Sequence, residues 1–309
     1  MYARPVIAGT SHLVSRRTTR RFFLLRPDAG GEQQRLFLYL LGVAAAKHGI
    51  RVYCVICMST HYHLVCSDVE GQTPRFFRDL HRWLAMTLKC HRGWDEEVWN
   101  KSQTSRVDLE SETALVDKCG YTIANCVAAG IVDRPRRYPG VITLAAEMGV
   151  RRDVIARPDN PWLVSETTWP AEVELRFEMP PELLAEYGDL AGAQAAIQGS
   201  VDRHVRDARA LLRAAGKGYV GAKRCMRASI ETRSTEAEPL RSRNPTFAVG
   251  AGKPRSAFFA AVEKMRGFRE AYAARWARYA DGDRGSPWPA GTWKMRVLHG
   301  STVESCGPP

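Results

Sequence analysis

The spacing of apolar and polar residues predicts a strand, a helix and a strand hairpin at the start of the chain. Residues 6–15 alternate loosely, and residues 51–58 are apolar and β-branched, which favours strands. Residues 61–67 follow as a third such run, so the last two strands are expected to pair as an antiparallel hairpin. Between the first two strands, residues 35–48 show helical spacing and end at Gly49, a common residue at helix ends.

A second helix and a fourth strand complete this pattern. Apolar residues recur every three or four positions from Thr73 to about Gly93, with Pro74 in the first turn, which indicates a helix that packs on a sheet. Residues 97–107 are predicted to form the fourth strand. The order β-α-β-β-α-β is that of a ferredoxin-like α+β fold. A further helix is expected over residues 112–130.

The rest of the chain has a less regular pattern. We expect residues 1–150 to form one domain and residues 151–309 to form a mainly α-helical, basic region, for which DNA gripping is a hypothesis. Helices are predicted at 183–186, 201–215 and 256–280, and a loop or linker at 234–254. The aromatic stripe of the last helix, which includes Phe258 and Trp276, is expected to be core rather than a base-stacking surface.

Composition narrows the class of partner. The chain has 309 residues, 45% of them hydrophobic and 25% charged, which is typical of a globular protein. Its net charge of +12 is carried mainly by arginine and is shared evenly between residues 1–150 and 151–309. Such a charge favours a nucleic-acid partner. The apolar run at 36–45 is shorter than the roughly 20 residues that span a bilayer, so no membrane segment is expected.

The eight cysteines are expected to be reduced thiols of a cytosolic protein, because they are scattered and no signal peptide is evident at the amino end. Cys54 and Cys57 have the spacing of half a zinc site. On a strand, however, this spacing points the two thiols to opposite faces, and no second close pair follows. A structural zinc protein is therefore kept only as a third alternative.

The stretch His61-Tyr62-His63 is the first candidate for chemistry. Strand side chains alternate with a period of two, so both imidazoles are expected on one face of the sheet. Tyr62 then points away from them, and we expect it to pack against the sheet rather than to act as a nucleophile. The two imidazoles could serve as two ligands of a metal ion, and a third donor would have to come from another part of the chain.

The helix over residues 112–130 contains a second group of polar side chains. Lys118, Tyr121 and Asn125 fall within about 60° of one another, away from the apolar side of the helix. Two neutral imidazoles and the carbonyl oxygen of Asn125 would hold a divalent cation without neutralising it, which leaves a strong Lewis acid for a phosphate oxygen. Tyr121 is the candidate nucleophile, because a phenol, with a pKa near 10, ionises far more readily than water.

These motifs resemble those of a known family. His61-Tyr62-His63 resembles the HUH motif, and residues 121–132, with Tyr121, Asn125, Gly130 and Val132, resemble the helix of single-tyrosine HUH transposases. The closest likeness is to the REP-associated tyrosine transposases and their insertion-sequence relatives, and it extends over roughly residues 6–142. By position, His61, His63 and Asn125 match the metal ligands of that family, and Tyr121 matches its nucleophile.

The resemblance implies a metal-dependent endonuclease and strand transferase that acts on single-stranded, hairpin or palindromic DNA. It further implies a 5′-phosphotyrosine intermediate, a free 3′-hydroxyl and Mg²⁺ or Mn²⁺ as cofactor. Such a protein would be cytoplasmic and would associate with the nucleoid when bound to DNA. Its DNA phosphates are expected to meet a set of basic residues, namely Lys118, Arg16, Arg17, Arg20, Arg21, Arg136 and Arg137.

The chain departs from the family pattern at three places. Residues 58–60 stand where the family usually has Met-Pro-Asn, Cys126 replaces the usual proline, and Tyr62 is an unusual, though still bulky, middle residue of the motif. None of these changes removes a group that the mechanism needs. The alternative is a domesticated, weakly active or inactive DNA-binding descendant. Sequence leaves the DNA target, the cleavage position and the choice between monomer and homodimer open.

Overall fold

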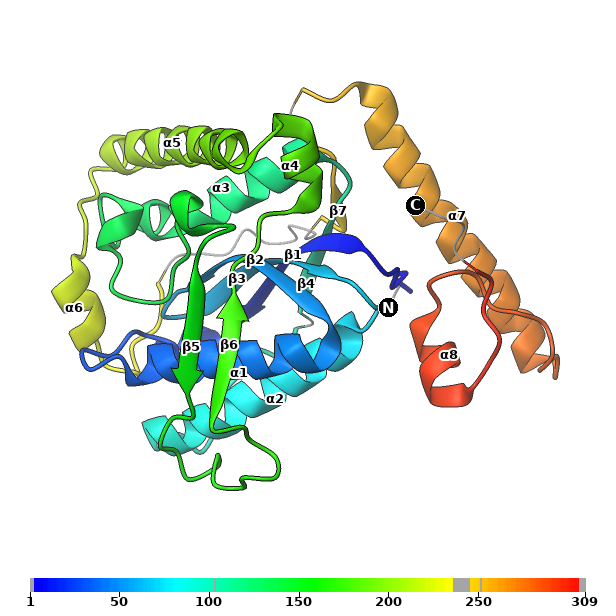
Figure 1. Cartoon of the computed structure of the whole chain (residues 1–309), viewed down its shortest axis with the longest axis horizontal. Coiled ribbons are helices and arrows are strands. Elements are labelled where there is room, and N and C mark those ends of the chain that lie inside the picture. Colours follow the sequence, from blue (N-terminus) through cyan, green and yellow to red (C-terminus); the bar gives the residue numbers. More distant parts are fainter. Residues whose placement is uncertain (1–2, 103, 236–244, 251, 306–309) are drawn as a thin grey trace.

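The computed structural model describes residues 3–102, 104–235, 245–250 and 252–305. Its first part contains β1 (Thr10–Arg17), α1 (Glu32–His48), β2 (Ile50–Cys57), β3 (His61–Asp68), α2 (Thr73–Arg92), β4 (Ser105–Leu109) and α3 (Glu112–Ala128). The order of these elements is β-α-β-β-α-β followed by a helix, as the spacing of apolar residues predicts (Figure 1).

The central sheet has five strands in the order β2-β3-β1-β4-β7. The first four are antiparallel to their neighbours, whereas β7 (Phe247–Ala248) is parallel to β4, which makes the sheet mixed. Strand β7 falls within the stretch 234–254 that was predicted to be a loop or linker, and most of the rest of that stretch, residues 236–244 and 251, lies outside the described residues.

The helix ends follow local chemistry. Gly49 and Gly93, each with a φ of 61°, end α1 and α2 in the left-handed conformation that glycine adopts without strain. Ser111 caps α3 by accepting a hydrogen bond from the backbone nitrogen of Ala114 at 3.2 Å. These three boundaries confirm the sequence predictions.

Strand β4 covers only the end of the predicted range 97–107. Trp99, in the earlier part of that range, makes an isolated bridge with Thr18, and its indole nitrogen donates a hydrogen bond to the backbone oxygen of His81 at 2.7 Å. The segment around Trp99 is thus held by side-chain contacts with α2 and by this single bridge. Helix propensity and strand propensity give no sign of such contacts.

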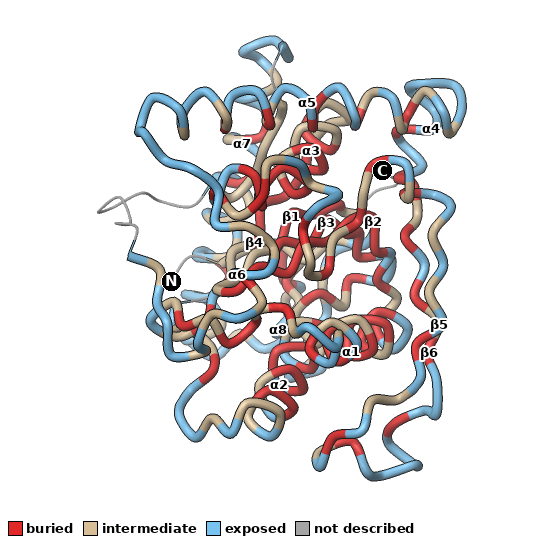
Figure 2. Tube along the Cα trace, turned by 90° about the vertical axis from the view of Figure 1, so that its left-hand side faces the viewer, coloured by how far each residue is buried: buried red, intermediate tan, exposed pale blue. Residues whose placement is uncertain are grey.

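Helices cover both faces of the sheet. Helices α1 and α2 lie on one face, and α3 lies on the other, beneath α5 (Figure 1). Alternate residues of β3 supply the two cores: Tyr62 and Leu64 belong to the core beneath α1 and α2, and Val65 belongs to the core beneath α3. The buried positions gather along these two layers (Figure 2). Alternate side chains of β3 therefore lie in different cores, one beneath α1 and α2 and the other beneath α3.

The carboxyl-terminal region is mainly helical and also contains a small sheet. Its helices are α4 (Pro181–Tyr187), α5 (Leu190–Ala214), α6 (Ala222–Arg227), α7 (Arg255–Ala280) and α8 (Trp293–His299). Three short 3-10 turns lie earlier in the chain, namely η1 (Thr19–Arg21), η2 (Pro135–Arg137) and η3 (Ala145–Glu147). Strands β5 (Arg152–Ala156) and β6 (Glu172–Arg176) form an antiparallel pair that the sequence did not predict, because most of their residues are exposed or half-buried.

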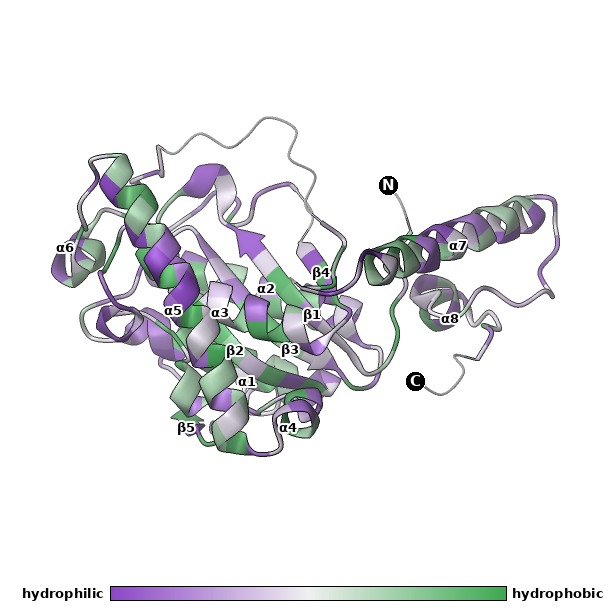
Figure 3. Cartoon of the chain, turned by 90° about the horizontal axis from the view of Figure 1, so that it is seen from above, coloured by the Kyte–Doolittle hydropathy of each residue, from purple (hydrophilic) through white to green (hydrophobic). Residues whose placement is uncertain are grey.

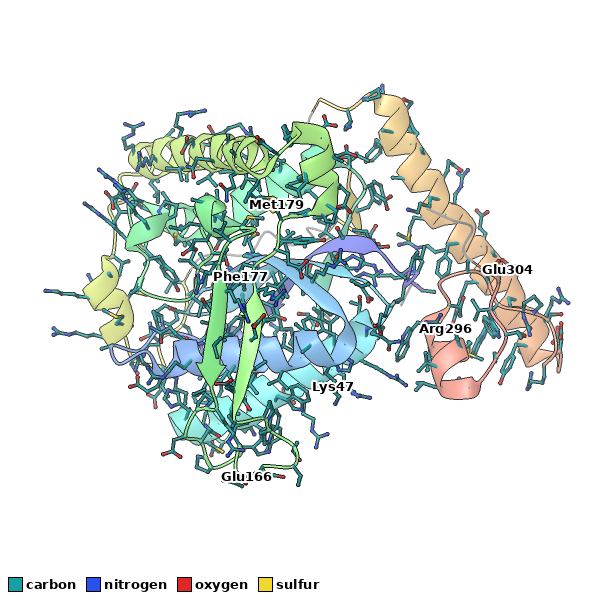
Figure 4. The ribbon with its side chains drawn as sticks, in the orientation of Figure 1. Lys47, Glu166, Phe177, Met179, Arg296 and Glu304 are labelled. Carbon is teal, nitrogen blue, oxygen red and sulfur yellow. The ribbon has the colours of Figure 1, made fainter. Side chains whose placement is uncertain are left out.

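The chain after β6 connects the two cores. Phe177 makes an isolated bridge with Val52, and the backbone nitrogen of Glu178 donates to the backbone oxygen of Val52 at 2.8 Å. Phe177 lies in the core beneath α1, and Met179 lies in the core beneath α3; both are labelled in Figure 4. This segment therefore covers the edge of the sheet at β2.

Helix α5 is part of the α3 core. Ile197, Val201 and Val205 of α5 are buried in the same apolar cluster as Cys119 and Ile123 of α3. Residues from both sides of position 150 thus share one core. The division into a domain of residues 1–150 and a region of residues 151–309 stays a prediction.

Helix α7 extends away from the sheet and packs against the segment around α8 (Figure 3). Its Met265 is buried, but Phe258 is 47% exposed and Trp276 is 50% exposed, so the expectation that the whole stripe is core was wrong for these two residues. The reason is that one side of the helix meets only a small partner, built around the buried Trp288. Among the described residues, no helix combines the length and the apolar character needed to cross a lipid bilayer.

The hydrogen bond between Tyr62 and His81 generates a prediction on stability. The Oη of Tyr62 and the Nε2 of His81 are 2.6 Å apart, and burial lowers the pKa of His81 to about 3, with the nearby Arg16 acting in the same direction. A histidine in the unfolded chain has a pKa near 6.5. Between about pH 6.5 and 3, the unfolded state therefore binds a proton at His81 that the native state does not bind, and the free energy of unfolding falls as the pH drops.

His81→Gln keeps an amide that can bond to Tyr62 and removes this titration. We expect the unfolding free energy of the variant, followed by denaturant titration, to depend less on pH between 6 and 4, by up to about 1.4 kcal/mol per pH unit. His299→Gln, on the exposed end of α8, is the control and should keep the slope of the unmodified protein. An identical slope in the His81 variant would contradict the assignment.

Candidate active site

His61 and His63 stand on the face of the sheet that α3 covers. Tyr62, between them, points to the opposite face, where it is fully buried, so the prediction that it packs on the sheet is confirmed. On the neighbouring strand β1, Arg17 is the partner of His61 and Ser15 is the partner of His63. The side chains of these four residues therefore lie on one side of the sheet.

Hydroxyl groups hold the two imidazoles. The ring centroids of His61 and His63 are 4.8 Å apart, with the planes at 81°. The Oγ of Ser15 lies 2.5 Å from the Nδ1 of His63, and the Oγ1 of Thr60 lies 2.9 Å from the Nδ1 of His61. Each ring is thus oriented through Nδ1, which leaves Nε2 to serve as a ligand.

Burial keeps both rings neutral. It lowers the pKa of His61 to about 4, helped by the positive charge of Arg17 and opposed by a hydrogen bond with the side chain of Asn125. Burial also lowers the pKa of His63 well below its usual value, and His61 and Arg17 act in the same direction. At neutral pH both imidazoles are therefore in the unprotonated form that binds metal ions.

Tyr121 and Asn125 approach this pair from α3. The ring of Tyr121 lies 5.3 Å from the ring of His63, centroid to centroid, in an edge-to-face arrangement. Asn125, one turn further along α3, is buried, and its side chain favours the charged forms of both His61 and Tyr121, because it raises the pKa of the imidazole and lowers that of the phenol. The structure thus brings together the four residues that the sequence singled out, from β3 and α3.

The phenol of Tyr121 is protonated at neutral pH. Burial raises its pKa, whereas the positive charge of Arg17 and the hydrogen bond with Asn125 act in the opposite direction. The Nζ of Lys118 lies 5.8 Å from the centroid of the Tyr121 ring and forms an ion pair of 2.9 Å with Asp117. The predicted phosphate partner Lys118 is therefore close to Tyr121 but already engaged by a carboxylate.

The arginines of the first strand separate into two groups. Arg17 is exposed on the side of the histidines, and its charge affects both of them. Arg16 faces the other side, where its guanidinium lies 5.8 Å from the Trp99 ring and donates to the backbone oxygen of Ser102. Arg20 and Arg21 follow in η1, with φ values of 44° and 58°. Of these four arginines, Arg17 is the one whose charge is felt by both histidines.

Arg136 and Arg137 lie on η2, beyond the end of α3. Arg137 forms an ion pair of 3.0 Å with Asp133, whereas Arg136 lines a pocket of about 540 Å³ between η2, η3 and α5. Three further arginines line the same pocket: Arg134, Arg206 and Arg209. Within the described residues, Arg136 and Arg206 make no ion pair.

One residue at this site escaped the sequence prediction. The ring of His204, on α5, lies 6.1 Å from the ring of Tyr121, and its Nε2 is 2.9 Å from the Oδ1 of Asp117. His204 is a lone histidine in a polar helix, far from Tyr121 in the chain, and no spacing links the two. Only the packing of α5 on α3 reveals it.

The donors present fit a divalent cation. Among the described residues, no group of three or more His, Cys, Asp or Glu side chains is placed to hold a metal ion. A third donor beside His61 and His63 would therefore be of another kind, and the side-chain oxygen of Asn125 is the candidate that the sequence singled out. The hydroxyl groups of Ser15 and Thr60 on Nδ1 are of the kind that commonly hold metal-binding histidines in place. A set of two neutral nitrogens and one amide oxygen suits Mn²⁺ somewhat better than Mg²⁺.

Comparisons with known proteins gave matches only in structure. No known family and no curated protein matches the sequence. A REP-associated tyrosine transposase bound to a REP hairpin is similar with a TM-score of 0.40 and 14% identity, over 48% of this chain and 84% of that chain. A putative transposase from Deinococcus radiodurans is similar with a TM-score of 0.28 and 16% identity, over 35% and 85%.

The first of these structures is a transposase and the second a putative one, which is the class that the sequence resembles. Both TM-scores lie below 0.5, so the evidence for function comes from the side chains of the site itself.

The hydroxyl of Ser15 is expected to affect the affinity of the site for metal ions. Because it orients the ring of His63, Ser15→Ala is expected to weaken Mn²⁺ binding by about tenfold or more, measured by calorimetric titration of the apo protein. Ser11→Ala, on the same strand and opposite Ser67 rather than a histidine, is the matched control. Equal affinities for the two variants would show that Ser15 has no such role.

Proposed function

We propose that this protein is a metal-dependent single-strand DNA endonuclease and strand transferase, a transposase of the single-tyrosine HUH type. The observation that carries the proposal is the meeting of Tyr121 and Asn125, from α3, with His61 and His63, from β3. The four side chains provide two neutral nitrogen ligands, an oxygen ligand and a nucleophile at one place.

The strand order supports the ferredoxin-like part of this proposal. In the sheet, the strands β2-β3-β1-β4 are antiparallel, and two helices on one face connect them as β-α-β-β-α-β. In this arrangement the middle strands β1 and β3 carry Arg17, His61 and His63 side by side. We propose that this part of the chain is an HUH nuclease domain.

His61, His63 and Asn125 would hold Mg²⁺ or Mn²⁺. When bound, such a cation polarises a phosphate oxygen and stabilises the negative charge that develops as the phosphorus is attacked. The role of the protein is to keep the two imidazoles unprotonated and oriented, which burial and the hydroxyls of Ser15 and Thr60 achieve.

Tyr121 would perform the covalent step. Its Oη loses a proton and forms a bond to the phosphorus of the scissile phosphate, while the bond from phosphorus to the 3′-oxygen breaks and that oxygen takes up a proton. The products are a 5′-phosphotyrosine and a free 3′-hydroxyl. Because a phenolate leaves readily, a 3′-hydroxyl can attack the phosphotyrosine, reverse the step and join a new strand without ATP.

The charge distribution supports DNA as the partner. Arg17 lies exposed next to His61, where it can pair with a phosphate of the strand being cut. The pocket lined by Arg134, Arg136, Arg206 and Arg209 offers a second place for backbone phosphates. We propose that the bound DNA is single-stranded with a hairpin or palindromic part, and that the protein acts in the cytoplasm at the nucleoid.

One observation favours the alternative of a DNA-binding protein without useful activity. Burial raises the pKa of Tyr121, and this makes the phenolate harder to form. Such a protein would bind DNA equally well with and without EDTA, and His61→Ala would change neither affinity nor phenotype.

Tyr121→Phe is expected to abolish a covalent protein–DNA adduct, because it removes the only atom that attacks phosphorus. The adduct is measured by denaturing gel electrophoresis after incubation with labelled hairpin oligonucleotides and Mn²⁺, and EDTA should remove it as well. Tyr62→Phe is the matched control, since the buried Tyr62 cannot reach DNA. Adduct formation by the Tyr121 variant would refute the assignment of the nucleophile.

Two neighbouring arginines test the arginine pocket. Arg136 has no ion pair among the described residues, whereas Arg137 is engaged by Asp133. Arg136→Ala is therefore expected to weaken hairpin binding and to reduce the slope of log K against log salt by about 0.9, and Arg137→Ala to change both less. Fluorescence anisotropy at several salt concentrations measures these values. Equal effects of the two variants would exclude a specific phosphate contact in the pocket.

A further inference from the structure

The candidate nucleophile lies between a strand and a distant helix. The ring of Tyr121 contacts the ring of His63, from β3, at 5.3 Å and the ring of His204, from α5, at 6.1 Å, both in edge-to-face arrangements. Two imidazoles from different parts of the chain therefore limit where the phenol can point. His63 is accounted for as a metal ligand, and the role of His204 is not.

Asp117 fixes the position of His204. Its Oδ1 accepts from the Nε2 of His204 at 2.9 Å, and its Oδ2 is 2.9 Å from the Nζ of Lys118. Arg203, next to His204 on α5, also reaches Asp117, at 3.4 Å. The hydrogen bond with His204 is the largest cause of a lowered pKa of Asp117, with Lys118 acting in the same direction. The carboxylate is thus ionised and joins α5 to the turn of α3 that precedes Tyr121.

Close packing at Gly120 makes this contact possible. A Cβ at Gly120 would lie 2.9 Å from the backbone carbon of Ser200 and closer still to the Ser200 side chain, so α5 approaches α3 at the residue next to Tyr121. Ser200 is one helical turn before His204, which brings His204 over Tyr121. The apolar cluster that includes Cys119, Ile197 and Val201 seals the same interface.

We propose that His204, held by Asp117, is a positioning residue for Tyr121, and that α5 thereby completes the active site from the carboxyl-terminal region. The inference rests on the proposed function of Tyr121. A nucleophilic attack requires the Oη to approach phosphorus in line with the bond that breaks, and a displacement of about 1 Å can reduce the rate by about a hundredfold. The ring of His204 and its bond to Asp117 restrict the rotation of the phenol against the side of β3.

Three variants separate the ring contact from the hydrogen bond. His204→Ala removes both, His204→Phe keeps a ring against Tyr121, and His204→Gln keeps a donor towards Asp117. Asp117→Asn is the second site, in case a change at His204 disturbs the fold. His299→Gln, exposed on α8, is the control for the loss of a histidine. All should be prepared as the full chain and compared by thermal melting.

The rate of adduct formation is measured in single turnovers at saturating hairpin DNA and Mn²⁺, and hairpin affinity is measured separately. We expect His204→Ala to lower the rate at saturation by about tenfold to a hundredfold with unchanged hairpin affinity, and His204→Gln or His204→Phe to restore part of it. Asp117→Asn should also lower the rate. A rate of His204→Ala equal to that of the unmodified protein, with adduct formed by both, would overturn the inference and leave the proposed function standing.

If the unmodified protein forms no adduct, the proposed function fails. The position of Tyr121 relative to His204 can then still be tested by a measurement that needs no catalysis. The chain is prepared with 3-fluorotyrosine, and the fluorine resonance of Tyr121 is identified by its loss in Tyr121→Phe. His204→Ala should shift or broaden this resonance, while His299→Gln should not. An unchanged resonance in His204→Ala would show that His204 does not position Tyr121.

Discussion

The packing of α3 on the sheet is the contact on which the whole site depends. Cys119, Ile123 and Val127 direct one side of α3 into the core that includes Val65 of β3. Because helix residues four apart share a side and strand residues two apart share a face, this contact fixes Tyr121 and Asn125 against His61 and His63. A rotation of α3 by one residue, about 100°, would separate Tyr121 and Asn125 from the two histidines.

Short-range physics explains why the sequence predicted this part. The HYH triplet needs only the alternation of a strand, and the relation of Tyr121 to Asn125 needs only one helical turn, so both follow from a few consecutive residues. The ends of α1 and α2 follow likewise from Gly49 and Gly93. By contrast, most residues of β5 and β6 are exposed or half-buried, and β6 shows only a short alternation, at Val173 and Leu175. Their pairing joins segments about 20 residues apart in the chain, which no local pattern reveals.

Long-range contacts decided what sequence reasoning missed. His204 reaches Tyr121 because Gly120 permits close approach of α5. No sequence pattern around His204 or Tyr121 predicts that these two residues are in contact. The basic residues show a related difficulty. Arg16 and Arg17 are adjacent in the chain, but strand side chains alternate, so Arg16 lies against Trp99 and Arg17 lies on the side of the histidines. A charge count cannot separate arginines that face the candidate site from arginines that hold the fold.

Burial acts on the two halves of the site in opposite ways. It favours the neutral forms of His61 and His63, which makes them better ligands, but it also favours the neutral form of Tyr121, which makes it a weaker nucleophile. Positive charge relieves this conflict, because it lowers the pKa of all three side chains. Arg17 already acts on each of them, and a divalent cation held by the histidines and Asn125 would strengthen the same effect at the phenol. Under the proposed function, a cation held by these neutral side chains would therefore favour ionisation of the phenol beside them.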